Sequence, residues 1–140
     1  MHRSGPGRIL VELEAQHAEL RKMMDRCEES IDELEQGRID VADIARETAR
    51  LRLAFTAHNT FEEQSLRPIL LANDAFGIVR CDRMIEDHIA EHRELRERMQ
   101  AATDSTAHLR DVIETLRAHL DAEERYLLTA KVLRAHAVGE

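Results

Sequence analysis

Seven side chains of the types that bind metal ions recur at helical spacing along this chain. They are five histidines and two glutamates: His17, His58, Glu62, His88, His92, His119 and Glu123. Six of them form pairs four residues apart, and this spacing puts both members of a pair on one face of a helix, about one turn apart. Four helices that brought these groups to one level would build a site that could hold two metal ions.

The same side chains interrupt four largely apolar stripes. Alternating steps of three and four residues trace these stripes over residues 13–34, 44–69, 81–99 and 109–133. Stripes of this kind pack helices into a bundle, so the candidate ligands lie on faces that should be buried. An ionisable group on a buried face costs several kcal/mol unless it is paired or binds a metal. We therefore interpret the set as metal ligands; the alternative is a polar network in a metal-free core.

The elements that must position these groups are four predicted helices, at about 8–36, 40–66, 78–102 and 106–136. Gly37 stops the first helix, and Asp40 is a plausible N-cap for the second. Pro68 lacks a backbone donor and should end or kink the second helix, leaving residues 69–72 as a displaced final turn. At about 1.5 Å per residue, all the candidates fall within about two turns of one level. The predicted fold class is all-α, an up-down-up-down antiparallel four-helix bundle.

Length and composition agree with one helical domain. The chain has 140 residues, only 5 Gly and 2 Pro, and 34% charged residues, so residues 1–140 are predicted to form a single domain. A formal net charge of −8, with basic residues interspersed among acids, disfavours nucleic acid as a partner. No apolar stretch approaches the ~18 residues of a membrane span, and the polar N-terminus lacks an apolar core. We therefore expect no membrane association and a cytoplasmic location.

The two cysteines, Cys27 and Cys81, lie on the first and third stripes, on opposite sides of the expected site. We expect them to be more than about 20 Å apart along the bundle, beyond the ~7 Å limit for a disulfide. Buried structural thiols are the favoured interpretation, and redox sensing is the alternative. Neither cysteine is expected to reach the metal site.

The order and spacing of these residues resemble the haemerythrin and HHE cation-binding superfamily over essentially the whole chain. The matching motifs are Gln16-His17, His58-x-x-x-Glu62-Glu63 with Leu66 and Pro68, His88-x-x-x-His92, and His119-x-x-x-Glu123-Glu124 with Leu127 and Leu128. The resemblance implies two iron ions in a non-haem, carboxylate-bridged di-iron centre, an oxo bridge being optional. It implies His88, His92 and His119 on one iron, His17 and His58 on the other, and Glu62 and Glu123 as bridges. The second iron would have one ligand fewer and an open position for O₂, NO or peroxide.

The fourth segment departs from the oxygen-carrying haemerythrins, in which an Asp five residues after the histidine is the ligand. Here positions 123 and 124 are both Glu. Around the helix axis, a side chain four residues after His119 is rotated from it by about 40° and stays on the stripe. A side chain five residues after His119 is rotated by about 140°. We therefore favour Glu123 as the ligand and expect Glu124 to be solvated or to lie behind a ligand. The pattern resembles the HHE branch more than the oxygen carriers, which argues against plain O₂ storage.

Two further residues near these motifs have competing interpretations. Tyr126 lies one turn beyond Glu123 and is either a core tyrosine or a hydroxyl that donates to a ligand or reaches an iron. Glu63 faces away from His58 by helical angle and is predicted to be a surface charge. Only Tyr126 is an evident general acid, so an enzyme and a binding protein both stay open.

The favoured function is that of a cytoplasmic di-iron protein that binds or reduces a small diatomic or peroxide molecule. Oxygen or redox sensing, NO handling and peroxide disposal all fit this class. Independently of the resemblance, mixed imidazole and carboxylate ligation suits iron or manganese better than structural zinc, which prefers a closed set rich in thiolate. The alternatives are a non-enzymatic iron-binding or iron-sensing protein and a metal-free helical interaction module.

Overall fold

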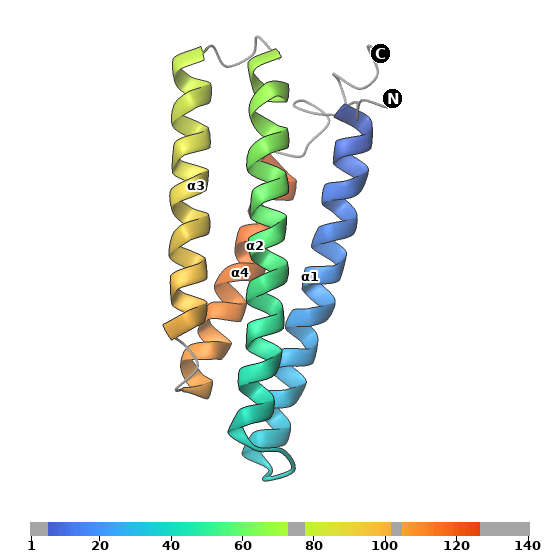
Figure 1. Ribbon diagram of the computed structural model, residues 1–140, viewed down its shortest axis with the longest axis vertical. Helices are drawn as coiled ribbons and strands as arrows, with labels where there is room; N and C mark the ends of the chain where they lie inside the picture. The colour runs from blue at the N-terminus through green and yellow to red at the C-terminus, as the bar shows by residue number, and fades with distance from the viewer. Residues whose placement is uncertain (1–5, 73–77, 102–104, 127–140) are drawn as a thin grey trace.

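Four α-helices make up the described part of the chain. The computed structural model describes residues 6–72, 78–101 and 105–126, with side chains over 8–65, 83–101 and 105–125. The helices are α1 (Pro6–Glu35), α2 (Val41–Ala72), α3 (Ile78–Ala101) and α4 (Thr106–Tyr126), and the described residues contain no strand. Successive helices run in opposite directions (Figure 1), and each helix packs mainly on two others, α1 on α2 and α4, and α3 on α2 and α4. The predicted all-α, up-down-up-down antiparallel four-helix bundle is confirmed.

The turn between α1 and α2 is built by one glycine and two aspartates. Gly37 has φ +74°, a left-handed conformation that glycine adopts without a Cβ clash, and its N–H donates to the Leu34 carbonyl at 3.0 Å. Asp40 Oδ1 then accepts from the Asp43 backbone N–H, while Asp43 Oδ2 accepts from the Asp40 N–H, each at 3.1 Å. This reciprocal pair satisfies N–H groups at the start of α2 that have no helical partner. Asp40 is the N-cap, as its position predicted.

The end of α2 differs from the prediction made from Pro68. The helix does not end near residue 66; it continues through Pro68 to Ala72. A proline inside a helix removes one backbone hydrogen bond, here to the Gln64 carbonyl, and its ring crowds that carbonyl at a cost of about 3 kcal/mol. The residues that follow are mostly leucine and alanine, which favour helix, so the loss of one bond does not stop it. The predicted extension of the last helix to about 136 lies outside the described residues.

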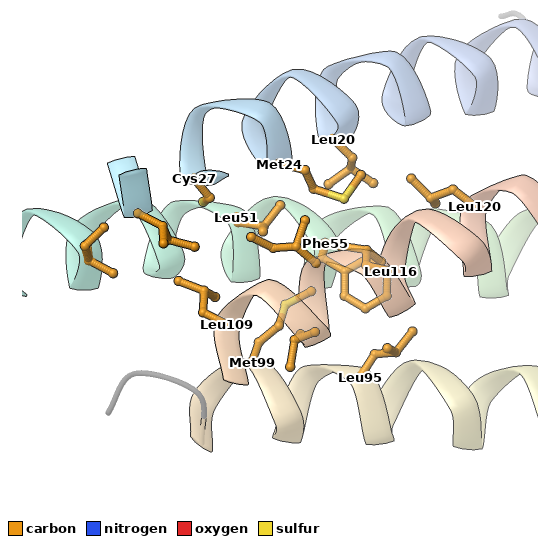
Figure 2. Close-up of a cluster of buried hydrophobic side chains, with 14 residues drawn as sticks. Leu20, Met24, Cys27, Leu51, Phe55, Leu95, Met99, Leu109, Leu116 and Leu120 are labelled. Atoms are coloured by element: carbon orange, nitrogen blue, oxygen red, sulfur yellow. The ribbon is translucent and has the colours of Figure 1, made fainter. Parts of the chain in front are cut away.

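The hydrophobic core fills the half of the bundle that lies between the metal-ligand candidates and the α1–α2 turn. It is built mainly from leucine, isoleucine and methionine, and its one aromatic ring, Phe55, packs beside Leu116 (Figure 2). Cys27 is buried in this core as a free thiol, and burial raises its pKa to about 11. Such a thiol stays protonated at neutral pH, which fits the structural interpretation. The side chain of Cys81 lies outside the described residues.

Arginines join α1 and α4 at three levels. Each guanidinium binds two carboxylates of the other helix: Arg21 binds Asp121 and Glu124, Arg117 binds Asp25 and Glu28, and Arg110 binds Asp32 and Glu35. The last two groups repeat after seven residues, from Arg110 to Arg117 and from Asp25 to Asp32, which keeps them on one face of each helix. They align α4 with α1 along the bundle.

The outer surface carries few large apolar side chains. Those that are exposed among the described residues are Val11, Val41 and Leu53. None of the described helices has an apolar, uncharged run long enough to cross a lipid bilayer.

Candidate metal centre

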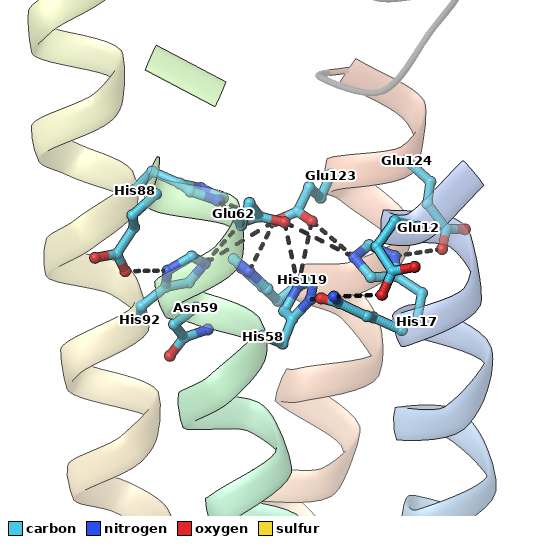
Figure 3. Close-up of polar contacts among 12 residues, drawn as sticks. Glu12, His17, His58, Asn59, Glu62, His88, His92, His119, Glu123 and Glu124 are labelled. Atoms are coloured by element: carbon cyan, nitrogen blue, oxygen red, sulfur yellow. Dashed lines mark hydrogen bonds and ion pairs between the residues drawn. The ribbon is translucent and has the colours of Figure 1, made fainter. Parts of the chain in front are cut away.

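All seven predicted ligands converge on one point inside the bundle. α1 supplies His17, α2 His58 and Glu62, α3 His88 and His92, and α4 His119 and Glu123 (Figure 3). Six of the seven are buried, and the His88 side chain is 12% exposed. The seven side chains lie at one level along the bundle axis because each is at a similar distance, in residues, from the turns that join the antiparallel helices. Their role as metal ligands stays a prediction.

The seven residues form two overlapping clusters. In each, one ligand atom per residue lies within 4.8 Å of all the others. We call the cluster around His88, His92 and His119 the three-histidine position, and the cluster around His17 and His58 the two-histidine position. Glu123 belongs to both clusters.

The carboxylate of Glu62 divides its oxygens between the two positions. Its Oε1 atom lies 3.1 Å from His92 Nε2 and also pairs with His88 Nε2, on the three-histidine side. Its Oε2 atom lies 3.2 Å from His58 Nε2, on the two-histidine side.

Glu123 does the same from the opposite side of the centre. Its Oε2 atom lies 3.0 Å from His88 Nε2 and 3.2 Å from His119 Nε2. Its Oε1 atom lies 2.8 Å from His17 Nε2. Two carboxylates that each present one oxygen to either cluster have the arrangement of bridging ligands between two ions.

His88 Nε2 and Glu62 Oε1 pair with each other, but the other seven atoms that face the centre have no hydrogen-bond partners among the described residues. They are the Nε2 atoms of His17, His58, His92 and His119, Glu62 Oε2, and both oxygens of Glu123. Many of these nitrogens and oxygens stand 2.8–3.2 Å apart, yet without the directions of a hydrogen bond. Adjacent ligands of one octahedral ion with bonds of about 2.1 Å also stand about 3 Å apart. Buried polar atoms without partners are costly, so the donor set fits metal ions.

The outer nitrogens of four histidine rings are each held by a side chain from another helix. The hydrogen bonds join a side-chain oxygen to a ring nitrogen: Glu124 to His17 at 2.6 Å, Gln16 to His58 at 2.7 Å, Glu63 to His92 at 2.8 Å, and Glu91 to His119 at 2.6 Å. In every case the contact is to Nδ1. An oxygen at Nδ1 fixes the proton there and leaves the Nε2 lone pair free to face the centre.

The outer partners form a closed ring around the bundle. α1 supplies a partner to a histidine of α2, α2 to α3, α3 to α4, and α4 back to α1. Each partner is also the sequence neighbour of a ligand: Gln16 precedes His17, Glu63 follows Glu62, Glu91 precedes His92, and Glu124 follows Glu123. We call these four residues the outer ring. Three of them carry a carboxylate, and Gln16 carries an amide.

The outer ring corrects one prediction and adds residues that the sequence had not singled out. Glu63 was predicted to be a surface charge, and that is wrong: its carboxylate bonds His92 Nδ1. A side chain turned about 100° from the ligand face points at the neighbouring helix rather than at water. Glu124 lies behind His17, one of the two places expected for it. Glu91 had not been singled out, and Gln16 had been noted only within a motif; adjacency to a ligand was the signal that could have found them.

The imidazoles and carboxylates shift one another's pKa values strongly. Burial acts to lower the pKa of His17 and His88, but the adjacent Glu123 and Glu62 carboxylates outweigh it and raise both to about 10. The same balance raises the pKa of His92 to about 9. Burial acts to raise the pKa of both glutamates, but the imidazoles packed around their carboxylates hold each pKa below its ordinary value. Without metal, the cluster therefore retains protons at neutral pH, and a bound cation would displace them.

Phe55 closes the centre on the side of the hydrophobic core. Its ring centroid lies 5.7 Å from that of His92, 6.3 Å from His119 and 6.4 Å from His58. This contact excludes water from beneath the ligands and restricts rotation of the imidazole rings. The side chain of Tyr126 lies outside the described residues.

The fold and the centre together define a helical-bundle cation-binding protein. A family model described as Hemerythrin HHE cation binding domain matches residues 8–130. The chain therefore belongs to the hemerythrin HHE cation-binding family. No curated protein and no solved structure gives a significant match to it.

Proposed function

We propose that this is a non-haem di-iron protein that binds or reduces O₂, NO or peroxide, in oxygen or redox sensing or in peroxide or NO handling. The observation that carries the proposal is the division of the Glu62 and Glu123 oxygens between a position with three histidines and a position with two. The three-histidine position has five donors, three imidazole nitrogens and two oxygens. The two-histidine position has four, two nitrogens and two oxygens, which leaves a six-coordinate ion two places short.

The donor types favour iron over structural zinc. Structural zinc sites are tetrahedral and commonly use thiolates, whereas these clusters offer only imidazole and carboxylate. Carboxylates and histidines that project inward from the helices of a four-helix bundle are the ligand types of di-iron and di-manganese bundle proteins. When bound, iron supplies one-electron redox chemistry and Lewis acidity toward a small molecule.

The protein's residues contribute binding, orientation and exclusion of water. The Glu62 and Glu123 carboxylates would hold ions at both positions, and the outer ring fixes four imidazoles with Nε2 inward. Phe55 excludes water on the core side. A small molecule would therefore meet ions whose protein ligands are held in place, and the two-histidine position would have one more open place than the three-histidine position.

Metal analysis and spectroscopy test the proposal. Protein loaded anaerobically with excess Fe(II) should retain close to two irons per chain, since each cluster offers four or five donors. Exposure to O₂, NO or peroxide should then produce new visible absorption. A stoichiometry near zero or one in excess iron would contradict the di-iron centre. Two irons with no spectral response to any of the three molecules would favour the alternative, an iron-binding or iron-sensing protein without small-molecule chemistry.

A further inference from the structure

The outer partners of the two positions differ in charge. At the three-histidine position, Glu63 and Glu91 hold His92 and His119 with carboxylates, and no guanidinium contacts either carboxylate among the described residues. A carboxylate on Nδ1–H raises the basicity of Nε2 and strengthens its bond to a cation. Both partnered histidines of this position therefore gain affinity from a negative outer partner.

The two-histidine position has weaker outer partners. His58 is held by the neutral amide of Gln16. The amide is oriented because its nitrogen donates to Glu12 Oε1 at 3.1 Å, which leaves its oxygen for His58 Nδ1. His17 is held by Glu124, but Arg21 donates to both oxygens of that carboxylate, at 2.7 and 3.0 Å, and neutralises it.

A hollow in the surface lies beside the outer partner of His58, at the two-histidine position. The hollow, of about 260 Å³, opens between α1 and α2 and is lined by Gln16, Glu19, Leu20, Ala54, Ala57 and His58. It reaches the Gln16–His58 contact from outside. The short side chains of Ala54 and Ala57 leave this space beside the ring, so a water or a small chelating molecule can come near His58.

We propose that the two metal positions are unequal: the three-histidine position retains its ion, and the two-histidine position exchanges its ion, with Gln16 setting the difference. This inference rests on the proposed two-metal centre and concerns how that centre is loaded and emptied. Fewer donors, weaker outer partners and the neighbouring hollow act at the same position. Gln16 is a positioning residue, since it acts on the metal through His58.

A swap of neighbouring side chains tests the role of Gln16 without changing net charge or composition. In the double variant Glu12→Gln with Gln16→Glu, the carboxylate moves from the far end of the hydrogen-bonded chain to direct contact with His58 Nδ1. The protein is loaded anaerobically with Fe(II) and equilibrated against rising concentrations of a ferrous chelator, and the iron retained per chain is measured. Wild-type protein should lose iron in two steps, with a plateau at one iron per chain.

In the swap, the first step should move to about ten-fold or more higher chelator concentration, because moving an outer partner changes metal affinity by roughly 10–100-fold. The second step should stay in place. Gln16→Ala, which removes the partner, should move the first step the opposite way. Glu91→Gln should move the second step toward lower chelator, and the exposed Glu94→Gln on the same helix is the matched control that should move neither.

Two outcomes would overturn the inference and leave the proposed function standing. One is loss of both irons in a single step from wild-type protein that had bound two. The other is a first step that neither the swap nor Gln16→Ala moves. Saturation below two irons per chain in wild-type protein would instead contradict the two-metal centre itself.

Discussion

Glu123 and Glu124 are neighbours in sequence, and the structure gives them separate roles. Glu123 is buried between the two clusters and presents one oxygen to each. Glu124 bonds His17 from outside the centre, with Arg21 on its other side. The helical angle from His119 was enough to separate them in advance, because a residue four positions on stays on the buried stripe.

Substitution of each glutamate by glutamine should therefore give different defects. Glu123→Gln keeps the volume but removes a bridging charge from both positions, so iron retained at saturation should fall to at most about one per chain. Glu124→Gln should keep both irons at saturation and weaken binding by roughly ten-fold, as loss of an outer partner does. Iron content and a metal titration measure the two effects. Asp121→Asn, an exposed change at another carboxylate of Arg21, is the control. Greater iron loss in Glu124→Gln than in Glu123→Gln would reverse the assignment.

The raised histidine pKa values predict how the metal-free protein responds to pH. His17 and His88 have a pKa of about 10, and His92 about 9, against 6.5 for an ordinary histidine. Because these histidines bind a proton more tightly in the folded state than in the unfolded state, protonation stabilises the fold. This contribution is complete below pH 6.5 and is lost as the pH rises through 9 to 10. The melting temperature of metal-free protein should therefore fall between pH 7 and pH 10 in thermal denaturation. A flat or rising melting temperature over this range would contradict the shared-proton cluster.

Individual residues of the site differ in how far the sequence could predict them. The seven inward residues stood out because polar groups on an apolar stripe need an explanation. Glu63 and Glu91 did not, since a charged residue beside the stripe is ordinarily solvated. Their roles appear only when the neighbouring helix is in place, because the atoms they bond, His92 Nδ1 and His119 Nδ1, belong to that helix.

At the level of helices, a regularity links sequence position to the outer ring. The partner precedes a ligand in α1 and α3 and follows one in α2 and α4. Adjacent residues are about 100° apart around a helix axis, and reversing the helix reverses the sense of that rotation. Alternating the order therefore turns all the partners the same way around the bundle. Helix direction and the position of the ligand stripe are together sufficient to predict this pattern. The end of α2 could not be predicted in the same way, because the helix tolerates Pro68 and continues to Ala72.

The α1–α2 turn offers a test of the fold that leaves the site alone. Gly37 has a positive φ, and a Cβ added there would meet nothing within 4 Å. Gly37→Ala should cost about 1 kcal/mol through backbone strain alone. Unfolding in denaturant measures this loss, and iron stoichiometry should be unchanged. Arg38→Ala in the same exposed turn should cost much less. Equal stabilities of Gly37→Ala and the wild type would show that the left-handed conformation is not required.

For the whole molecule, metal occupancy should govern stability. Seven ionisable side chains meet inside the bundle, and a cation that binds only the folded state stabilises it by mass action. Free metal at 100 times Kd would add about 2.7 kcal/mol for each occupied position. Thermal melts with and without Fe(II) should therefore differ clearly, while Glu123→Gln should respond less. Identical melting temperatures for the metal-free and loaded protein would place the bound ions outside the core.

The outer ring also bears on the handedness of the bundle. Four antiparallel helices joined by short turns can be arranged clockwise or anticlockwise around the axis, and an apolar stripe packs in either arrangement. The outer partners break this symmetry, because all of them are rotated to the same side of their ligands and reach only the next helix in one arrangement. In the mirror arrangement, the outer partners would face away from the four histidines that they hold, and those rings would lose their Nδ1 contacts. The residues that orient the ligands therefore also favour the observed topology over its mirror arrangement.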